Sequence, residues 1–172
     1  MKNIESKFNE AFKKGNVYRP LDWSVFNNYF PSLNGYALDF GAGRGDSSLF
    51  LAKLGLKVDA IDFSKEAFKQ RIKHKNINYI LGSNIPDKKY DFILLKHVIA
   101  FIKDKKKFIE ILKSHLKKNG KLLIVTPVKR KNYNMHQKLI SVSAKLFDDS
   151  FELLHREYGG NLEVRYYNYK KL

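Results

Sequence analysis

The sequence contains no cysteine. Disulfide bridges, cysteine-ligated zinc sites and thiol nucleophiles are therefore excluded, and we expect no metal site. It also lacks an uninterrupted apolar run long enough to cross a membrane. The first 14 residues mix charged side chains with Ile4, Phe8 and Phe12 at helical spacing, which is unlike a signal peptide. These absences predict a cytoplasmic protein with no membrane partner.

Arginine is scarce although the chain is strongly basic. The formal net charge is +16, from 33 basic and 17 acidic residues, but only six of the basic residues are arginine. Arginine is the preferred residue for bidentate phosphate and base contacts. The lysines within residues 103–107 alternate with Phe108, Ile111 and Leu112, a spacing typical of an amphipathic helix with a solvated face. We therefore interpret the charge as compositional, and nucleic acid is a less favoured partner than a small molecule.

A strand, a glycine-rich loop and a helix are predicted in the first third of the chain. The apolar residues 36–40 run into Gly-Ala-Gly-Arg-Gly at 41–45. Glycines allow a tight turn and a close approach of the backbone to a ligand. Residues 46–48, Asp-Ser-Ser, can open a helix. The apolar side chains expected to face a sheet are Leu49, Phe50 and Leu54.

The glycine spacing and two acidic residues indicate the type of cofactor. The pattern is Gly-x-Gly-x-Gly, whereas the dinucleotide fingerprint is Gly-x-Gly-x-x-Gly. Asp39, two positions before the first glycine, would repel a pyrophosphate but could hold an ammonium group. A second apolar segment, 57–62, ends in Asp62, which can accept hydrogen bonds from two adjacent ribose hydroxyls. The combination predicts S-adenosylmethionine, which carries an amino acid and a sulfonium but no phosphate. The alternative is an ordinary glycine turn beside an acidic strand end.

Strands and helices alternate along the rest of the chain. Ser64 can cap a helix running to about His74, and strands are expected at 78–81, 90–95 and 121–126. Asp104 should open a helix that Asn119-Gly120 closes, and Pro127 should end the strand that follows. This order predicts an α/β fold with a doubly wound, mostly parallel sheet. We expect a single domain over 1–172, with a helical lid at 1–31 and a core at 32–172.

The C-terminal part departs from the alternation. Residues 151–158 and 162–169 are predicted to be strands joined by the Gly-Gly-Asn turn at 159–161, which makes an antiparallel hairpin. Residues 129–141 are too polar for a strand and are expected to form a loop and a helix.

The motif residues resemble class I S-adenosylmethionine-dependent methyltransferases over nearly the entire chain. The resemblance rests on residues 39–45 (Asp-Phe-Gly-Ala-Gly-Arg-Gly), on Asp62 and on residues 90–93 (Tyr-Asp-Phe-Ile). A narrower resemblance, to tellurite-resistance methyltransferases, rests on residues 83–85 (Ser-Asn-Ile), residues 90–94 with the apolar stretch 98–102, and residues 154–156 (Leu-His-Arg) before a Gly-Asn turn. The chain differs from that group at two places. The group has an arginine just after the turn, where this chain has Asn161 or Leu162. It also has an acidic residue after the third strand, where this chain has Ser83-Asn84.

The resemblance implies S-adenosylmethionine as cofactor, S-adenosylhomocysteine as product, and metalloid oxyanions or small nucleophiles as acceptors. It also implies a Rossmann-like fold and a lid near the N-terminus, to which Tyr18, Arg19 and Trp23 would belong. The cofactor-binding residues expected from motif and resemblance are Asp39, Phe40, Gly41, Ala42, Gly43, Gly45, Asp62, Phe63, Ser83, Asn84, Ile85 and Lys96.

Three residues are candidates for acting on the methyl acceptor. His97 follows the fourth strand, at the edge where open α/β sheets bind ligands, and an ordinary imidazole pKa suits a general base at neutral pH. It could equally cap the strand. His155 and Arg156 could hold an anionic acceptor. Neighbours in a strand point to opposite faces, so both can line one site only if a bulge intervenes.

Other interpretations remain open from the sequence. Tyr18, Trp23 and Phe26 can form an aromatic lid over the sulfonium, or they can be helix-packing residues. An RNA methyltransferase would fit the net charge, but no Asn-Pro-Pro-Tyr type motif follows the fourth strand, where Leu-Lys-His-Val stands at 95–98. A third hypothesis is that the protein is non-catalytic and binds the cofactor or a partner protein. We expect an enzyme that methylates a small molecule.

Overall fold

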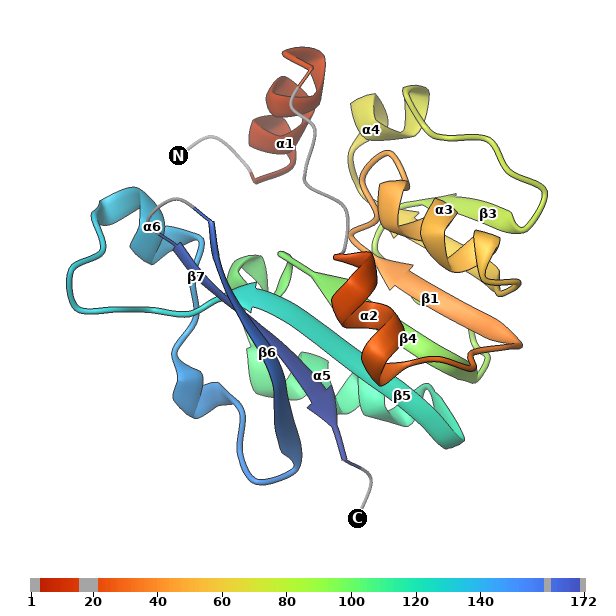
Figure 1. Cartoon of the computed structure of the whole chain (residues 1–172). Coiled ribbons are helices and arrows are strands. Elements are labelled where there is room, and N and C mark those ends of the chain that lie inside the picture. Colours follow the sequence, from red (N-terminus) through yellow and green to blue (C-terminus); the bar gives the residue numbers. More distant parts are fainter. Residues whose placement is uncertain (1–3, 16–21, 160–161, 171–172) are drawn as a thin grey trace. The chain divides into compact units, whose positions relative to one another are not determined.

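The computed structural model describes residues 4–15, 22–159 and 162–170, and it has a mixed α/β fold. Seven strands form a sheet that is mostly parallel and finishes in an antiparallel C-terminal hairpin, as predicted (Figure 1). The chain divides into two compact units, Met1–Lys88 and Lys89–Leu172.

The first unit contains three parallel strands in the order β3-β2-β1. Register pairs Phe40 with Ile61, and Asp62 with Leu81, so the three strands end at the same edge. The elements are α1 (Ile4–Lys13), α2 (Trp23–Tyr29), β1 (Tyr36–Phe40), α3 (Asp46–Lys53), β2 (Lys57–Asp62), α4 (Lys65–Lys69) and β3 (Ile77–Leu81).

The core of this unit is built from the apolar faces predicted for β1, α3 and β2. Leu38 and Ile61 are fully buried, and the ring of Phe50 meets that of Phe26 edge-on with their centroids 4.8 Å apart. Leu54 differs from expectation, because it follows the last residue of α3 and is 38% exposed. It contributes little to the buried face of that helix.

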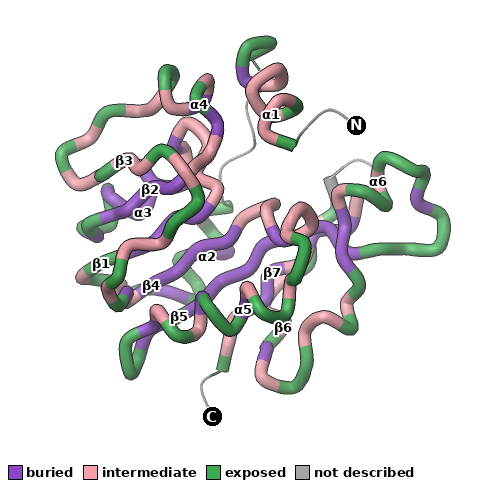
Figure 2. The backbone as a smooth tube through the Cα atoms, turned by 180° about the vertical axis from the view of Figure 1, so that it is seen from behind, coloured by how far each residue is buried: buried purple, intermediate pink, exposed green. Residues whose placement is uncertain are grey.

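The second unit contains the remaining four strands in the order β4-β5-β7-β6. β4 and β5 are parallel, whereas β7 is antiparallel to both β5 and β6. Figure 2 shows the middle of β4 and the second half of β5 as buried, which agrees with the apolar runs at 92–95 and 122–125. The elements are β4 (Tyr90–Lys96), η1 (Ile99–Phe101), α5 (Lys105–Ser114), β5 (Leu116–Pro127), α6 (Met135–Leu139), η2 (Ala144–Leu146), β6 (Phe151–Gly159) and β7 (Leu162–Tyr169).

The helix after β2 is shorter than predicted. Ser64 caps α4 by accepting a hydrogen bond from the Ala67 main chain, as expected, but the helix ends at Lys69 rather than near His74. Beyond it, the main-chain N–H of Ile72 donates to the carbonyl of Arg44, 2.9 Å away. This bond to the glycine loop draws the chain out of the helix. It joins residues far apart in sequence, so local propensity could not reveal it.

The junction of α5 and β5 is also different from the prediction. Asp104 caps α5, but the helix ends at Ser114, and Asn119-Gly120 lies inside β5. The ladder shifts between Tyr90 and Phe92, and a Cβ on Gly120 would lie 2.7 Å from the carbonyl oxygen of Tyr90. Gly120 therefore allows β5 to approach the backbone of β4 closely at the register shift, and it does not end a helix.

The lysine-rich face of α5 is solvated, as predicted. Lys106 and Lys107 are exposed, while Ile109 and Leu112 are buried. Ile111 is 38% exposed and lies outside the buried face. Among the described helices, none combines the length and apolar character that a membrane span requires.

Candidate functional site

The glycine loop follows β1 and is held by main-chain hydrogen bonds to β2. The N–H groups of Gly41 and Ala42 both donate to the carbonyl of Ile61, at 2.8 and 2.9 Å. Gly41, Gly43 and Gly45 have φ values of +77°, +57° and +92°. Side chains are disfavoured in this left-handed region, so the three glycines explain how the loop can turn so tightly. The loop leaves its backbone close to the end of β2.

Asp62 closes the loop from the end of β2. Its Oδ2 accepts a hydrogen bond of 2.8 Å from the Gly43 N–H, and its Oδ1 accepts one of 2.7 Å from the Ser64 N–H. Burial raises the pKa of Asp62, although both backbone hydrogen bonds act to lower it. A carboxylate has about four acceptor positions, so further donors can still be bound. Asp62 can thus shape the loop and accept ligand hydroxyls at once.

Asp39 lies deeper than Asp62. It is 2% exposed, and the buried Ser48 hydroxyl donates to its Oδ2 at 2.6 Å. Ser48 is in the first turn of α3, so this bond ties the end of β1 to the helix after the loop. The predicted contact of Asp39 with an ammonium group stays a prediction.

Tyr79 on β3 is a loop-supporting residue that sequence reasoning missed. Its hydroxyl lies 3.0 Å from the Arg44 carbonyl and 2.8 Å from that of Ile72. Burial, reinforced by the negative charges of Asp39 and Asp46, raises the pKa of Tyr79 to about 12. The phenol therefore remains a hydrogen-bond donor at physiological pH. The available signal was a polar aromatic residue inside the short strand predicted at 78–81.

The segment after β3 lies at the same edge of the sheet. The Gly82 N–H donates to the Asp62 carbonyl at 2.8 Å. Ser83 and Asn84, which follow it, are exposed, and Ile85 is half-buried. Phe40 is buried, whereas Phe63 is half-buried. The structure thus gathers the predicted cofactor residues of the first unit at the carboxyl ends of β1, β2 and β3.

Lys96 and His97 lie in the second unit, where β4 ends. The His97 N–H donates to the Val125 carbonyl at 2.8 Å, so the residue continues the ladder with β5. His97 has a φ of +57°, unusual for any residue except glycine. Burial, with a smaller effect of Lys96, lowers the pKa of His97 to about 4. The expectation of an ordinary imidazole pKa is therefore wrong, and the ring is neutral at physiological pH.

The hairpin places His155 away from His97 within this unit. The register runs from Lys96 to Val125, then to Tyr166 and His155, so two strands intervene. Three strand spacings correspond to roughly 14 Å. The His155 ring lies edge-on to that of Tyr166, with centroids 5.4 Å apart. The backbones of the two histidines are therefore well separated across the sheet.

His155 and Arg156 stay on opposite faces of β6. The ladder shift lies between Leu153 and His155, before the pair, and Arg156 is opposite Arg165 in the continuing register. The bulge that would have brought both side chains to one face is thus in the wrong place. Arg156 is exposed and His155 is half-buried.

A buried carboxylate in β7 was not predicted. Glu163 is 5% exposed and accepts a hydrogen bond of 2.6 Å from Nε of Arg165, while Nε of Arg130 lies 3.7 Å away. The Glu163 N–H donates to the Tyr133 hydroxyl at 2.6 Å, and its carbonyl accepts from the Val128 N–H. The arginines compensate the charge of Glu163, which indicates a structural role in holding the segment after β5.

The predicted lid residues have different outcomes. Tyr18 and Arg19 lie outside the described residues, and Trp23 is the first residue of α2. Phe26 is 1% exposed and packs on Phe50, so it belongs to the core and the lid interpretation is wrong for it. In the described ranges, no three histidine or acidic side chains come together as metal ligands.

Comparison with known proteins decides the family. A model described as a methyltransferase domain matches residues 18–159. The chain belongs to this methyltransferase family. A protein of Staphylococcus carnosus called an uncharacterized methyltransferase is 33% identical over 113 residues, 59% of this chain and 55% of that protein. The chain covers only part of the length of the curated relatives that it matches, 60% and 55% of the first two.

Solved methyltransferase structures share the fold. TehB from Haemophilus influenzae is 20% identical, with a TM-score of 0.63 over 96% of this chain and 67% of that chain. The plantazolicin methyltransferase BpumL, in complex with a triazolic desmethylPZN analog and S-adenosylhomocysteine, is 14% identical, with a TM-score of 0.66 over 99% of this chain and 87% of that chain. At these identities TehB shows a shared methyltransferase fold, and it leaves the narrower tellurite-resistance resemblance a prediction.

Proposed function

We propose that this methyltransferase binds S-adenosylmethionine at the carboxyl ends of β1, β2 and β3 and methylates a small molecule. The observation that carries the proposal is the position of Asp62. Both of its carboxylate oxygens accept backbone hydrogen bonds, one from the glycine loop and one from the turn after β2. A rigid, half-buried acceptor is thereby held beside a backbone that a ligand can approach closely.

The residues fit the polar parts of this cofactor. Asp62 is assigned to the two ribose hydroxyls, and Asp39 to the ammonium group of the methionine moiety. Residues 83–85, with Phe63, form the surroundings assigned to the adenine. Gly41, Ala42, Gly43 and Gly45, with Phe40, supply the backbone that approaches the methionine and ribose portions, and Lys96 remains a cofactor-binding prediction in the second unit.

The reaction needs alignment more than strong acid or base chemistry. S-adenosylmethionine supplies a methyl group on a positively charged sulfur, and S-adenosylhomocysteine is left after transfer. The chain then has to orient an acceptor lone pair in line with the methyl carbon and exclude water. His97 is neutral at physiological pH and can accept a proton or orient the acceptor, but its low pKa makes it a weak base.

The acceptor class proposed here is a small molecule or a metalloid oxyanion. Of the hairpin pair, Arg156 is proposed to meet the acceptor, because His155 points to the opposite face of β6 and no bulge brings the two side chains together. An anionic acceptor would gain a charge-assisted hydrogen bond from Arg156, which is exposed. We place the site of action in the cytoplasm.

The proposal is tested by isothermal titration calorimetry with S-adenosylmethionine and S-adenosylhomocysteine, followed by methyl-transfer assays. Tellurite, selenite, small thiols and amines form the first acceptor panel, with RNA as a separate arm. Micromolar cofactor binding with turnover of a small acceptor is the expected result. Turnover on RNA alone would contradict the acceptor class, and cofactor binding without turnover on any arm would favour the non-catalytic alternative.

A further inference from the structure

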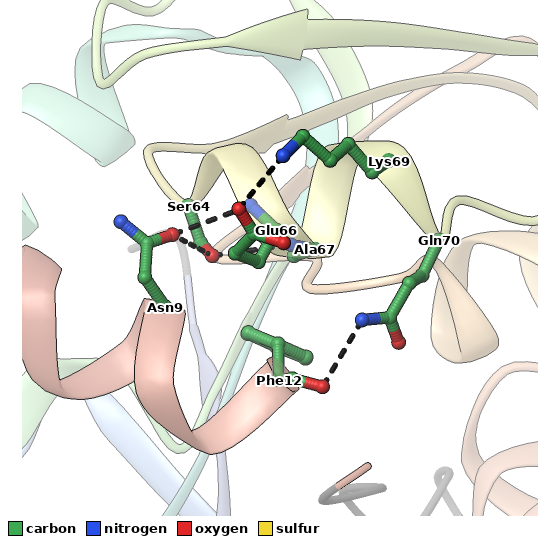
Figure 3. Close-up of polar contacts among 7 residues, drawn as sticks. All are labelled: Asn9, Phe12, Ser64, Glu66, Ala67, Lys69 and Gln70. Carbon is green, nitrogen blue, oxygen red and sulfur yellow. Dashed lines mark hydrogen bonds and ion pairs between the residues drawn. The ribbon is translucent and has the colours of Figure 1, made fainter. Parts of the chain in front are cut away.

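The N-terminal helix α1 contacts both ends of α4, the short helix that follows Asp62. The Oδ1 of Asn9 accepts a hydrogen bond of 2.7 Å from the Ser64 hydroxyl and one of 3.3 Å from the Glu66 N–H. At the other end of α4, Nε2 of Gln70 donates to the Phe12 carbonyl at 3.0 Å. Figure 3 shows Asn9 directed at the start of α4 and Gln70 directed back to α1. Two separate contacts thus fix α1 along α4.

Two aromatic residues extend this contact to the predicted cofactor residues. The Phe8 ring meets that of Phe63 nearly edge-on, with centroids 5.7 Å apart. Phe12 is 3% exposed, and its ring would lie 3.1 Å from a Cβ on Gly43. Its neighbours in the chain differ, because Ala11 is half-buried and Lys13 is exposed. α1 therefore touches the glycine loop and the residue that follows Asp62.

Ser64 connects α1 to Asp62 through hydrogen bonds. Its N–H donates to Asp62, while its fully buried hydroxyl accepts from the Ala67 N–H. A hydroxyl has a single proton to donate, and the side-chain Oδ1 of Asn9 accepts it. Without Asn9 the buried Ser64 hydroxyl would lose this acceptor, which weakens the support of the backbone that holds Asp62.

We propose that Asn9 is a positioning residue of the cofactor site, which acts on Asp62 through Ser64 and so couples α1 to cofactor binding. The inference rests on the proposed function, because it assigns a role to residues beside the cofactor. A ten-residue helix is marginal on its own, so α1 depends on its contacts with the rest of the first unit. Linkage then requires that cofactor binding and docking of α1 strengthen each other equally.

The first test compares S-adenosylhomocysteine affinities by calorimetry. Asn9→Ala is expected to weaken binding about fivefold, because it removes the amide oxygen that accepts hydrogen bonds from the Ser64 hydroxyl and the Glu66 N–H. Lys7→Ala, an exposed position on the same helix, is the matched control and should stay within about twofold. In a Ser64→Ala background, adding Asn9→Ala should weaken binding by no more than about twofold. The Ser64–Asn9 bond is already absent there, and the longer bond from the Glu66 N–H is all that the second change removes.

The second test measures hydrogen exchange of residues 4–13 in the unmodified protein, with and without S-adenosylhomocysteine. Slower exchange of α1 in the presence of ligand is expected. Faster exchange would overturn the inference, since the helix would then compete with the ligand, and so would equal affinities of Asn9→Ala and the unmodified protein. Absence of S-adenosylhomocysteine binding by the unmodified protein would contradict the proposed function itself, and with it this inference.

Discussion

The hydroxyl of Tyr79 occupies the space that a Cβ on Gly45 would need, at a separation of only 1.9 Å. Gly45 also has a φ of +92° and precedes the first residue of α3. The glycine is therefore required twice, by its backbone conformation and by the aromatic residue packed against it. Tyr79 is in turn tied to the loop through the Arg44 carbonyl.

We predict that Gly45→Ala destabilises the protein more than Gly55→Ala does. Gly55 has a similar φ of +98° but no atom within 4 Å of its potential Cβ, so both variants carry backbone strain and only the first adds a clash. The difference in the free energy of unfolding should be at least about 1 kcal/mol. Chemical denaturation measures it. Equal losses in the two variants would show that Tyr79 moves away at little cost.

We predict that His97 makes stability depend on pH between about 4 and 6.5. In the unfolded chain its imidazole has the ordinary pKa of 6.5, whereas burial lowers the folded pKa to about 4. The unfolded state therefore binds more protons in this window, and acidification through it favours unfolding. The loss should approach roughly 2–3 kcal/mol at pH 4 and vanish above pH 7.

The check is chemical denaturation at pH 4.5, 5.5 and 7 for the unmodified protein and for His97→Asn. Asparagine tolerates the positive φ of this position and does not titrate. The variant should lose less stability between pH 7 and pH 4.5, by roughly 2–2.5 kcal/mol. If the free energy of unfolding falls by the same amount in both proteins between pH 7 and pH 4.5, the lowered pKa of His97 is contradicted.

We predict that His97 and Arg156 act on the acceptor. His97→Asn and Arg156→Ala should lower the rate of methyl transfer to the acceptor identified by the panel. The affinity for the cofactor should stay within about threefold, less than 1 kcal/mol. Single-turnover kinetics measure the rate of methyl transfer, and calorimetry measures the affinity for the cofactor. If both variants keep full activity, these residues have structural roles only.

We predict that RNA binds weakly and without sequence preference. The net charge of +16 attracts phosphates, and the counterions released on binding make the affinity fall steeply as salt is added. Binding measured by fluorescence anisotropy should largely disappear near 150 mM salt. Salt-resistant binding of one RNA, together with methyl incorporation, would instead support the RNA alternative.

The strands and the cofactor loop could be predicted from sequence because their signals are local. The apolar runs that became β1, β2 and β4 are bounded by glycine or charged residues, and residues 41–45 carry their own turn chemistry. The hairpin could also be predicted, because the Gly-Gly-Asn stretch separates two runs rich in aromatic and branched residues.

Long-range contacts explain what could not be predicted. The end of α4 depends on the bond from Ile72 to Arg44, and the support of the glycine loop depends on Tyr79, 35 residues away from its Arg44 partner. The pKa of His97 depends on burial that no single sequence reveals. Whether the hairpin residues could share a face depended on the position of one bulge, which lies before His155.

The central claim is tested most directly by calorimetry of S-adenosylhomocysteine binding to the unmodified protein and to Asp62→Ala. The variant loses a buried acceptor for the ribose and for the backbone of Gly43, so its affinity should fall by roughly 1–3 kcal/mol, or about 5- to 150-fold. Circular dichroism verifies that both proteins are folded. Equal affinities in two folded proteins would remove Asp62 from the site and contradict the account.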